Sequence, residues 1–392
     1  MPGSLIFSNT SKAYPHKSVS ELKQTVWMFK MLNSTIGKIG KSFLKWAINW
    51  HLPIRPIIKA TLYKHFVGGE ALEDSLIAVE KLNEFGVRSL LDYSEEAQDN
   101  ENGFGNAFRE LERNIIFASK HPALPFSAFK ITAIGHSGIL EKKSKGDELT
   151  GLEEEGWAKI QSRVARLCQA AADNGVYLLI DAEESWIQPA IDELANDMMA
   201  KHNRQRVSII NTYQLYRKDR LDALKSDFNR AVNEGYLFGA KPVRGAYQVK
   251  EHKRADEKGY RSPIQDSKAE TDQDYNEAVS FCIKNLEKTL LVVATHNEES
   301  TRLAADLALS GAYPKNHNHL WFSQLYGMCD HLSFNLAGEG YNVVKYVPYG
   351  PVHSVTPYLI RRAEENSSVE GQAMKEINLL KKEIARRKMA KA

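Results

Sequence analysis

Residues 290–297 read LLVVATHN, a run of five apolar residues followed by threonine, histidine and asparagine. A run that is apolar throughout predicts a strand buried on both faces, as in a parallel sheet. Similar runs recur along the chain, so we expect eight strands, at residues 89–92, 129–134, 177–181, 208–213, 237–243, 290–295, 320–324 and 343–347. The gaps mostly hold amphipathic stretches, such as residues 72–85 and 300–309, that are long enough for crossover helices.

Eight strand–helix repeats without internal sequence similarity predict the fold class, an α/β chain folded as a (βα)8 TIM-like barrel. We expect three parts: a basic helical N-terminal arm over residues 1–65, the barrel over residues 66–366, and a basic amphipathic C-terminal helix over residues 367–392. An open, doubly wound sheet is the alternative arrangement of the same elements.

The composition suits one folded domain with appendages. The 392 residues are 43% hydrophobic, enough for a large core, and no run of about 18 apolar residues is present that would span a bilayer. The three cysteines, Cys168, Cys282 and Cys329, are odd in number and widely spaced. This pattern indicates a reducing compartment and argues against a structural metal site.

Charge is distributed unevenly along the chain. Residues 1–65 hold ten Lys/Arg and one Glu, residues 371–392 hold seven Lys/Arg and two Glu, and the net charge is +3, so residues 66–370 carry −11. Basic ends on an acidic body predict peripheral contact with an anionic membrane rather than a nucleic-acid groove. Solvated helix faces are the alternative explanation. We expect a cytoplasmic protein at the inner membrane face, or a mitochondrial one in a eukaryote.

The sequence lacks two common nucleotide-binding motifs. Residues 37–42, GKIGKS, end like a phosphate-binding loop, but that pattern needs glycine at position 35, where this chain has Thr35. No GxGxxG follows a predicted strand, so a nicotinamide-dependent dehydrogenase has no support.

Polar residues stand at the end of nearly every predicted strand. In a barrel these positions face the mouth, where the active sites of such folds lie. The residues are Asp92, Thr132, Asp181, Glu183, Gln214, Lys241, Arg244, Thr295, His296, Gln324 and Tyr346. Any one alone is more often a structural hydrogen-bond partner, but their coincidence predicts a site at the mouth.

The stretch after the last predicted strand carries a possible anion clamp. Tyr358, Arg361, Arg362 and Glu365 follow one another at i, i+3, i+4 and i+7, on or near one face of a helix. Adjacent arginines on a helix are usually solvated. Directly after a barrel strand, however, two guanidinium forks suit bidentate binding of a carboxylate, at roughly 1.5–3 kcal/mol for each charged hydrogen bond.

These residues belong to a longer pattern that resembles the proline dehydrogenase family. The matching pieces run in family order from Lys59 to Ser368: KATLYKHFVGGE, LLDYSEE, KITAIG, LLIDAEE, NTYQLY, GAKPVRGAYQ, ATHN, QLYGMCD, and YVPYG followed by PYLIRRAEEN. A single piece occurs by chance, whereas nine in order do not.

The resemblance implies roles for individual residues. The substrate carboxylate would be bound by Lys59, Arg361 and Arg362. The proline ring would pack against Tyr346 and Tyr358. Asp92 and Lys241 match the family's active-site pair, with Lys241 near flavin N5. The positions that would hold or border FAD are Tyr93, Gln214, Arg244, Gly245, Ala246, Tyr247, Gln248, Thr295 and His296. Glu365 belongs to the same group and would position the two arginines.

Two residues depart from the family pattern. Many bacterial members have arginine where this chain has Lys241, although the mitochondrial branch is similar in having lysine, which is a more mobile point charge. Pro242 stands where leucine is usual and removes a backbone donor from a strand. We expect contacts at Lys241 to be the most affected.

The resemblance implies oxidation of L-proline to Δ1-pyrroline-5-carboxylate, by hydride transfer from C5 to N5 of FAD. Electrons would pass to a membrane quinone, and a separate pyrroline-5-carboxylate dehydrogenase would act next. The rivals are a hydroxyproline dehydrogenase, a flavin-bound, membrane-docked barrel without catalysis, and a phosphate-binding barrel of unrelated function. Tyr346 favours proline over hydroxyproline, because its side chain would crowd a 4-hydroxyl group.

Overall fold

The computed structural model describes residues 5–33, 59–94, 99–368 and 370–390, with side chains described except at residues 59, 60, 353, 357 and 363–373. The chain divides into two compact units: residues 1–96 with 324–392, called unit 1, and residues 97–323, called unit 2. Within the described ranges, no helix is both long and apolar enough to cross a membrane.

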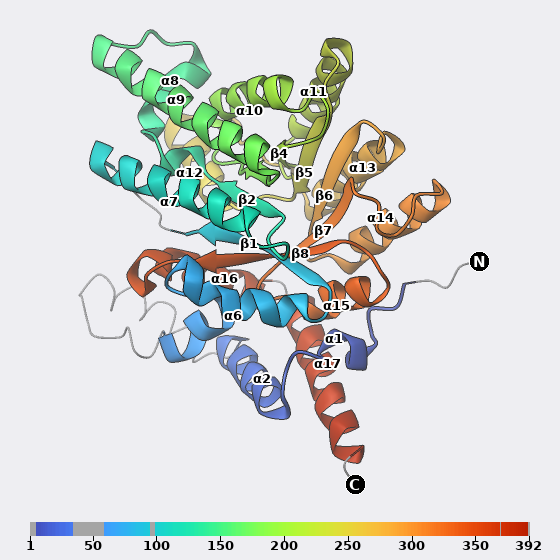
Figure 1. Cartoon of the computed structure of the whole chain (residues 1–392). Coiled ribbons are helices and arrows are strands. Elements are labelled where there is room, and N and C mark those ends of the chain that lie inside the picture. The colour runs from blue at the N-terminus through green and yellow to red at the C-terminus, as the bar shows by residue number, and fades with distance from the viewer. Residues whose placement is uncertain (1–4, 34–58, 95–98, 369, 391–392) are drawn as a thin grey trace. The chain divides into compact units, whose positions relative to one another are not determined.

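Eight parallel strands follow one another in chain order and form a closed barrel, which confirms the predicted fold class (Figure 1). They are β1 Val87–Tyr93, β2 Phe126–Phe129, β3 Tyr177–Ile180, β4 Ile209–Gln214, β5 Phe238–Val243, β6 Thr289–Ala294, β7 Leu320–Leu325 and β8 Val343–Tyr349. Almost every strand residue is buried, as expected for strands covered on both faces.

The prediction of a second strand at residues 129–134 was wrong, except that Phe129 is the last residue of β2. Strand β2 ends at Phe129, and Ile131–Ala133 form the 3-10 turn η2. Ile131 and Ile134 are fully buried, so this stretch is apolar because it packs into the core and not because it is extended. The strand lies earlier, in the FSAF stretch after Pro125, where all four residues are buried.

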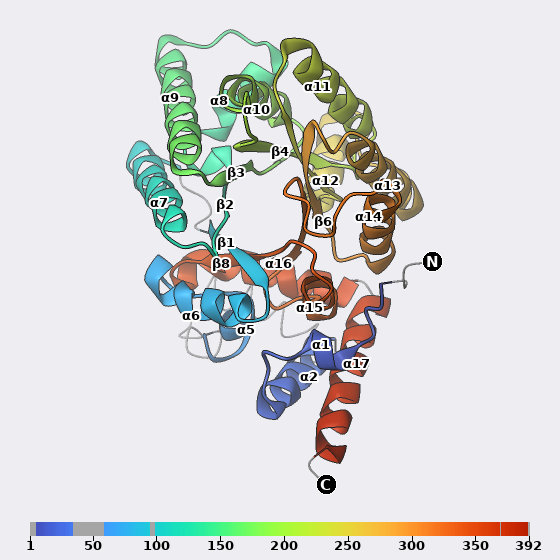
Figure 2. The ribbon, with the colours of Figure 1, turned by 45° about the vertical axis from the view of Figure 1, so that its right-hand side comes forward.

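Most helices of unit 2 lie on the outer side of its strands (Figure 2). The described helices of unit 2 are α7 Glu101–Ser119, α8 Ser137–Lys145, α9 Gly151–Asn174, α10 Gln188–His202, α11 Arg220–Glu234, α12 Gln248–Lys258, α13 Lys268–Lys284 and α14 Glu298–Ser310. Helices α9 and α13 each begin with a capping box, at Thr150 with Glu153 and at Ser267 with Glu270. These caps satisfy backbone donors that would otherwise lack partners at the helix starts.

In unit 1, helices from both ends of the chain pack together. Its helical elements within the described residues are α1 Thr10–Ala13, α2 Val19–Asn33, the π-helix η1 Lys59–Tyr63, α5 Lys64–Phe66, α6 Leu72–Asn83, α15 Asp330–Gly338, α16 Val352–Ser368 and α17 Glu370–Met389. Helices α2 and α17 lie side by side in both views and share one apolar cluster, which includes Leu22, Phe29 and Leu380. The predicted C-terminal helix is thus α17, whereas residues 34–58 of the predicted arm lie outside the described residues.

All three cysteines are buried free thiols. Cys168 lies on α9 and Cys282 on α13, both in unit 2, and Cys329 precedes α15 in unit 1. Burial raises the pKa of the Cys282 thiol to about 12 and raises that of Cys168 further.

The packing of α17 predicts an unequal response to two truncations on that helix. Leu380→Ala removes a fully buried side chain and should lower the free energy of unfolding by about 3 kcal/mol in urea titrations. Met374→Ala truncates a side chain that is 55% exposed and should cost less than about 1 kcal/mol. Equal effects of the two changes would show that α17 is not packed on α2 in solution.

Candidate functional site

A buried ion pair joins the ends of two strands in unit 2. The Lys241 side chain on β5 is 6% exposed, and its ammonium contacts the carboxylate of Asp181, the residue after β3. Neither ion is strongly solvated, so each depends on the other for charge compensation. The sequence predicted both residues at the strand ends but not that they pair.

Strand β5 continues through Pro242 without a break. Its pairing with β4 runs from Ala240 to Val243, and Pro242 stands opposite Tyr213. Pairing with β6 covers only Phe238 to Ala240. The missing backbone donor of Pro242 therefore falls beyond the last β6 partner, where it interrupts no ladder between β5 and β6.

Arg244, just after β5, is held rigidly by its neighbours. Its Nε donates to Asp272 at 2.7 Å, and its two terminal nitrogens donate to Thr295 at 2.7 Å and Ser300 at 3.0 Å. The guanidinium also lies 4.4 Å from the ring centroid of Tyr275. A guanidinium carries five N–H donors, so two of them have no acceptor among the residues that the structure describes.

The next residue, Gly245, lets the backbone pass close to a ring. Its φ is +140°, and a Cβ atom there would lie 2.4 Å from the ring of Tyr216. A side chain at this position would therefore need both an unfavourable backbone conformation and a displaced tyrosine. The close approach of the Tyr216 ring therefore requires glycine at this position.

Gln214 and Glu183 connect the loops beyond β3, β4 and β5. The Gln214 amide donates to the backbone carbonyl of Glu183 at 2.6 Å, and its oxygen accepts from the Ala246 N–H at 3.4 Å. The Glu183 carboxylate accepts from the Thr132 N–H at 3.0 Å and from the Thr132 hydroxyl. Burial raises the pKa of Glu183 to about 7, against these hydrogen bonds, which lower it.

The remaining predicted cofactor positions of unit 2 lie close by in sequence and differ in exposure. Thr295 is buried and accepts from Arg244, and its hydroxyl also accepts from the backbone N–H of Asn297 at 3.1 Å. His296 is half-buried, and Gln248 is exposed at the start of α12.

In unit 1, β1 and β8 bring three of the predicted residues to one pair of strands. They run parallel in continuous register, with Leu90 opposite Tyr346 and Asp92 opposite Pro348. Asp92 is 6% exposed and accepts a hydrogen bond from the Ser94 hydroxyl at 3.1 Å. The Tyr93 ring lies 5.4 Å from that of Tyr349, and Tyr346 is half-buried.

Helix α16 carries the predicted clamp. Tyr358 and Arg362 are both buried, and the guanidinium of Arg362 lies 5.1 Å from the ring centroid of Tyr358. Arg361 is half-buried. The side chains of Lys59 and Glu365 lie outside the described residues, although the backbone places Lys59 at the start of η1. Tyr63, on the same element, donates to the carbonyl of Gly350 at 2.8 Å and so ties η1 to the end of β8.

Sequence reasoning missed the partners of these residues. Asp272, which orients Arg244, lies on α13 and also pairs with Lys268. In the sequence, this charge pattern is typical of a solvated helix face. The pairing of Thr132 with Glu183 joins residues 51 positions apart. A single sequence contains no signal for such pairings, because each depends on the folded arrangement.

The residues around Arg244 fit a dinucleotide cofactor such as FAD. Two guanidinium N–H groups of Arg244 that no described residue accepts from lie next in sequence to the exposed backbone of Gly245, just after β5. This set of donors suits a diphosphate, which needs several N–H groups and close approach of the backbone.

The fold and these charged strand ends are typical of enzymes built on a (βα)8 barrel. The proline dehydrogenase family model matches residues 76–375, and the chain belongs to this family.

Individual relatives agree. The chain is 37% identical over 322 residues to the carbapenem antibiotics biosynthesis protein CarD of Pectobacterium carotovorum subsp. carotovorum, covering 82% of this chain and 83% of that protein. It is 32% identical over 426 residues to the mitochondrial proline dehydrogenase 1 of Dictyostelium discoideum, covering 97% and 74%. The human mitochondrial proline dehydrogenase 1 is 42% identical over 239 residues, 60% of this chain and 40% of that protein.

Solved structures show the same fold. Proline utilization A from Bdellovibrio bacteriovorus, inactivated by N-propargylglycine, superposes with a TM-score of 0.72 at 21% identity. The match covers 93% of this chain but only 38% of that longer protein. At this identity the likeness is one of fold.

The raised pKa of Glu183 predicts a pH-dependent stability. Its folded-state pKa of about 7 lies above the usual 4.5, so the native state binds more protons between these values and the free energy of unfolding falls as the pH rises through them. Glu183→Gln should remove this part of the decline. Thermal midpoints at pH 5 and pH 8 check it: the difference should shrink in Glu183→Gln and persist in Glu184→Gln, the adjacent residue, which pairs with Lys250.

Proposed function

We propose that this chain is an FAD-dependent L-proline dehydrogenase, which oxidises L-proline to Δ1-pyrroline-5-carboxylate. The observation that carries the proposal is the pair formed by Tyr358 and Arg362, buried together on α16 directly after β8. A guanidinium held over an aromatic ring combines a cationic fork with a flat apolar wall. A cyclic amino acid needs both, the fork for its carboxylate and the wall for its ring. Membership of the proline dehydrogenase family supports the same substrate.

The residues proposed to hold FAD are Tyr93, Gln214, Arg244, Gly245, Ala246, Gln248, Thr295, His296 and Glu365, with Tyr247 beside them. Among these, Arg244 is the best supported, because three fixed partners orient its guanidinium before any ligand binds. Bound FAD would supply the hydride acceptor, N5, for the hydrogen on C5 of proline.

The protein's own groups would orient the substrate and compensate charge. Lys59, Arg361 and Arg362 would bind the carboxylate, while Tyr346 and Tyr358 would exclude water from the ring. Hydride can leave C5 only when the amine is neutral, and the neutral form can be selected from solution, so no strong general base is assigned. We assign to Lys241, fixed by Asp181, stabilisation of the negative charge that accompanies transfer. Asp92 serves as a hydrogen-bonding or electrostatic partner.

We propose a membrane quinone as the electron acceptor, and a separate pyrroline-5-carboxylate dehydrogenase as the next enzyme. Contact with an anionic membrane face is supported by helix α17, where Lys381, Lys382 and Lys388 are exposed. Part of the basic end serves packing instead, because Arg387 donates to the backbone carbonyls of Tyr14 and Lys17 at 2.6 Å each. Several relatives are named as mitochondrial enzymes, which suits such a membrane location.

A hydroxyproline dehydrogenase is the second candidate. The enzyme of that name from Xenopus laevis is 32% identical over 393 residues, 91% of this chain. The half-buried Tyr346 on β8 supports proline, because a tyrosine against the substrate ring, the role we propose for it, would take the space that a 4-hydroxyl needs.

An absorbance spectrum followed by anaerobic substrate addition tests the proposal. The purified protein should show the flavin band near about 450 nm, and L-proline should bleach it far more readily than trans-4-hydroxy-L-proline. Preferential bleaching by hydroxyproline would favour the second candidate. A protein that neither contains nor takes up flavin would refute the assignment.

The carboxylate clamp predicts a loss of substrate binding energy in Arg362→Met. Removal of one or two charged hydrogen bonds should lower kcat/KM for L-proline by about 10²-fold, mostly through KM. Arg230→Met is the matched control, because Arg230 pairs with Asp197 and Glu234 on the surface and should leave kcat/KM within about twofold. An Arg362 variant with normal KM would remove this residue from the clamp.

A further inference from the structure

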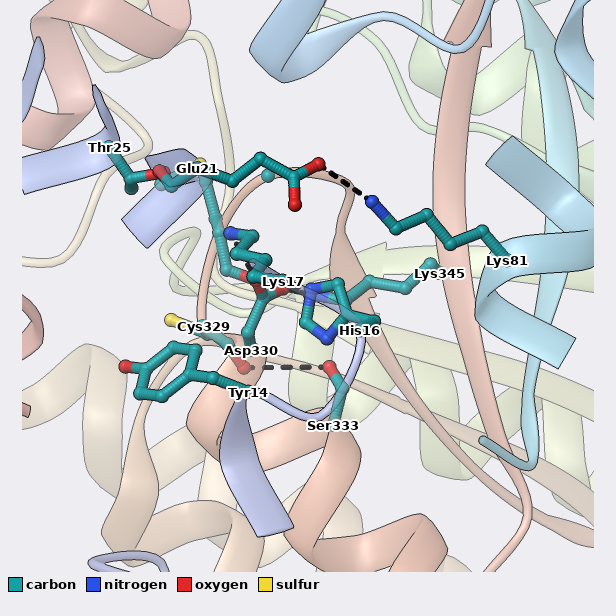
Figure 3. A network of polar contacts seen from close by, with 12 residues as sticks. Tyr14, His16, Lys17, Glu21, Thr25, Lys81, Cys329, Asp330, Ser333 and Lys345 are labelled. Carbon is teal, nitrogen blue, oxygen red and sulfur yellow. Dashed lines mark hydrogen bonds and ion pairs between the residues drawn. The ribbon is translucent and has the colours of Figure 1, made fainter. Parts of the chain in front are cut away.

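Asp330, the first residue of α15, is the centre of a buried charge cluster in unit 1 (Figure 3). One carboxylate oxygen lies 2.9 Å from the ammonium of Lys345 on β8. The other lies 2.7 Å from the ammonium of Lys17 and 3.3 Å from Nε2 of His16. Lys17 and His16 come from the segment between α1 and α2, so this one carboxylate joins the N-terminal arm to a barrel strand.

Lys345 also fastens the loop between β7 and α15. Its side chain is fully buried, and its ammonium donates to the backbone carbonyl of Leu325 at 3.2 Å and to that of Met328. The next residue on β8, Tyr346, accepts a hydrogen bond at its carbonyl from the Tyr326 N–H at 2.9 Å. The loop is therefore attached to β8 on both sides of the Lys345–Tyr346 peptide.

This loop has an unfavourable backbone conformation. Cys329 is left-handed, with φ +52°, which is uncommon for a residue other than glycine. Gly327 has φ +76°, and a Cβ atom there would lie 2.4 Å from the carbonyl oxygen of His65. Such a conformation persists only where surrounding contacts hold it, and the Lys345 and Asp330 bonds are contacts of that kind.

The arm's contribution is electrostatic as well as steric. With Lys17 and Lys345 beside it, the pKa of Asp330 is held well below its usual range despite burial, so the carboxylate stays ionised. Burial lowers the pKa of His16 to about 4, so the ring is neutral and donates from Nε2. The same ring stacks on Phe334 of α15, with centroids 3.9 Å apart. Loss of Lys17 would leave Asp330 under-compensated and the α15 start less firmly held.

We propose that Lys17 is a positioning residue for the substrate pocket: through Asp330 and Lys345 it fixes the 325–330 loop against β8, and so sets the position of Tyr346. The inference rests on the proposed function, in which Tyr346 walls the substrate ring. The N-terminal arm thereby takes part in selecting between proline and its 4-hydroxylated form, without touching the substrate.

The test compares Lys17→Met and Lys17→Arg with the wild-type full-length protein in steady-state assays with both substrates. Lys17→Met should raise KM for L-proline about fivefold, leave kcat within about twofold, and lower the preference for proline over trans-4-hydroxy-L-proline by a similar factor. Lys17→Arg keeps the charge and should restore much of the preference.

The matched control is Arg220→Met, which breaks a buried pair with Asp192 in unit 2, far from β8 in sequence. It should lower Tm without changing the preference between the two substrates. A Lys17→Met protein that loses Tm like the control but keeps the wild-type KM and preference would show that the cluster serves stability only, and would overturn the inference.

A second variant keeps the test decisive if Lys17→Met does not fold. His16→Phe retains the stack on Phe334 and removes only the hydrogen bond to Asp330, so it should shift the preference in the same direction by a smaller factor. An unchanged preference in a folded His16→Phe protein would count against the inference. A wild-type protein that oxidises neither substrate would instead refute the proposed function, and the inference with it.

Discussion

A strand covered on both faces has no water with which to solvate a charge, and this constraint governs how ions are placed around the barrel. Three cations at or just after the strands therefore each contact a carboxylate: Lys241 contacts Asp181, Arg244 contacts Asp272, and Lys345 contacts Asp330. The carboxylates of Asp272 and Asp330 each contact a second cation as well, Lys268 and Lys17 respectively. Removing one partner of a buried pair typically costs about 3–5 kcal/mol, because the other charge is left uncompensated. Each pair therefore fixes the relative position of two segments that are distant in the sequence.

The pairs differ in what they join. In unit 2 they connect residues that follow one strand with another strand or helix, where several of the candidate site residues lie. In unit 1, Asp330 also binds residues of the N-terminal segment, and Arg387 of α17 donates to that segment's backbone. The N-terminal segment is thus held by both α15 and α17.

Much of the barrel could be predicted from the sequence, because runs such as LLVVA have few structures open to them besides a buried strand. The failure at residues 129–134 has a physical reason: Ile131 and Ile134 are buried in a short 3-10 turn, and burial alone does not distinguish a turn from a strand. Family motifs placed Tyr358, Arg362, Lys241 and Arg244 near the strand ends. Their partners lacked any local signal, since Asp272 lies 28 residues from Arg244 on a helix with its own ion pair.

The three buried thiols can report local opening of the structure by their reactivity. A thiol reacts as the thiolate, and burial raises the pKa of Cys168 and Cys282, so both should resist alkylation until the surrounding helices open. Cys168 and Cys282 belong to unit 2 and Cys329 to unit 1, where it sits in the strained turn before α15. Rates of thiol labelling, read cysteine by cysteine, would thus time the opening of each unit separately without any introduced probe.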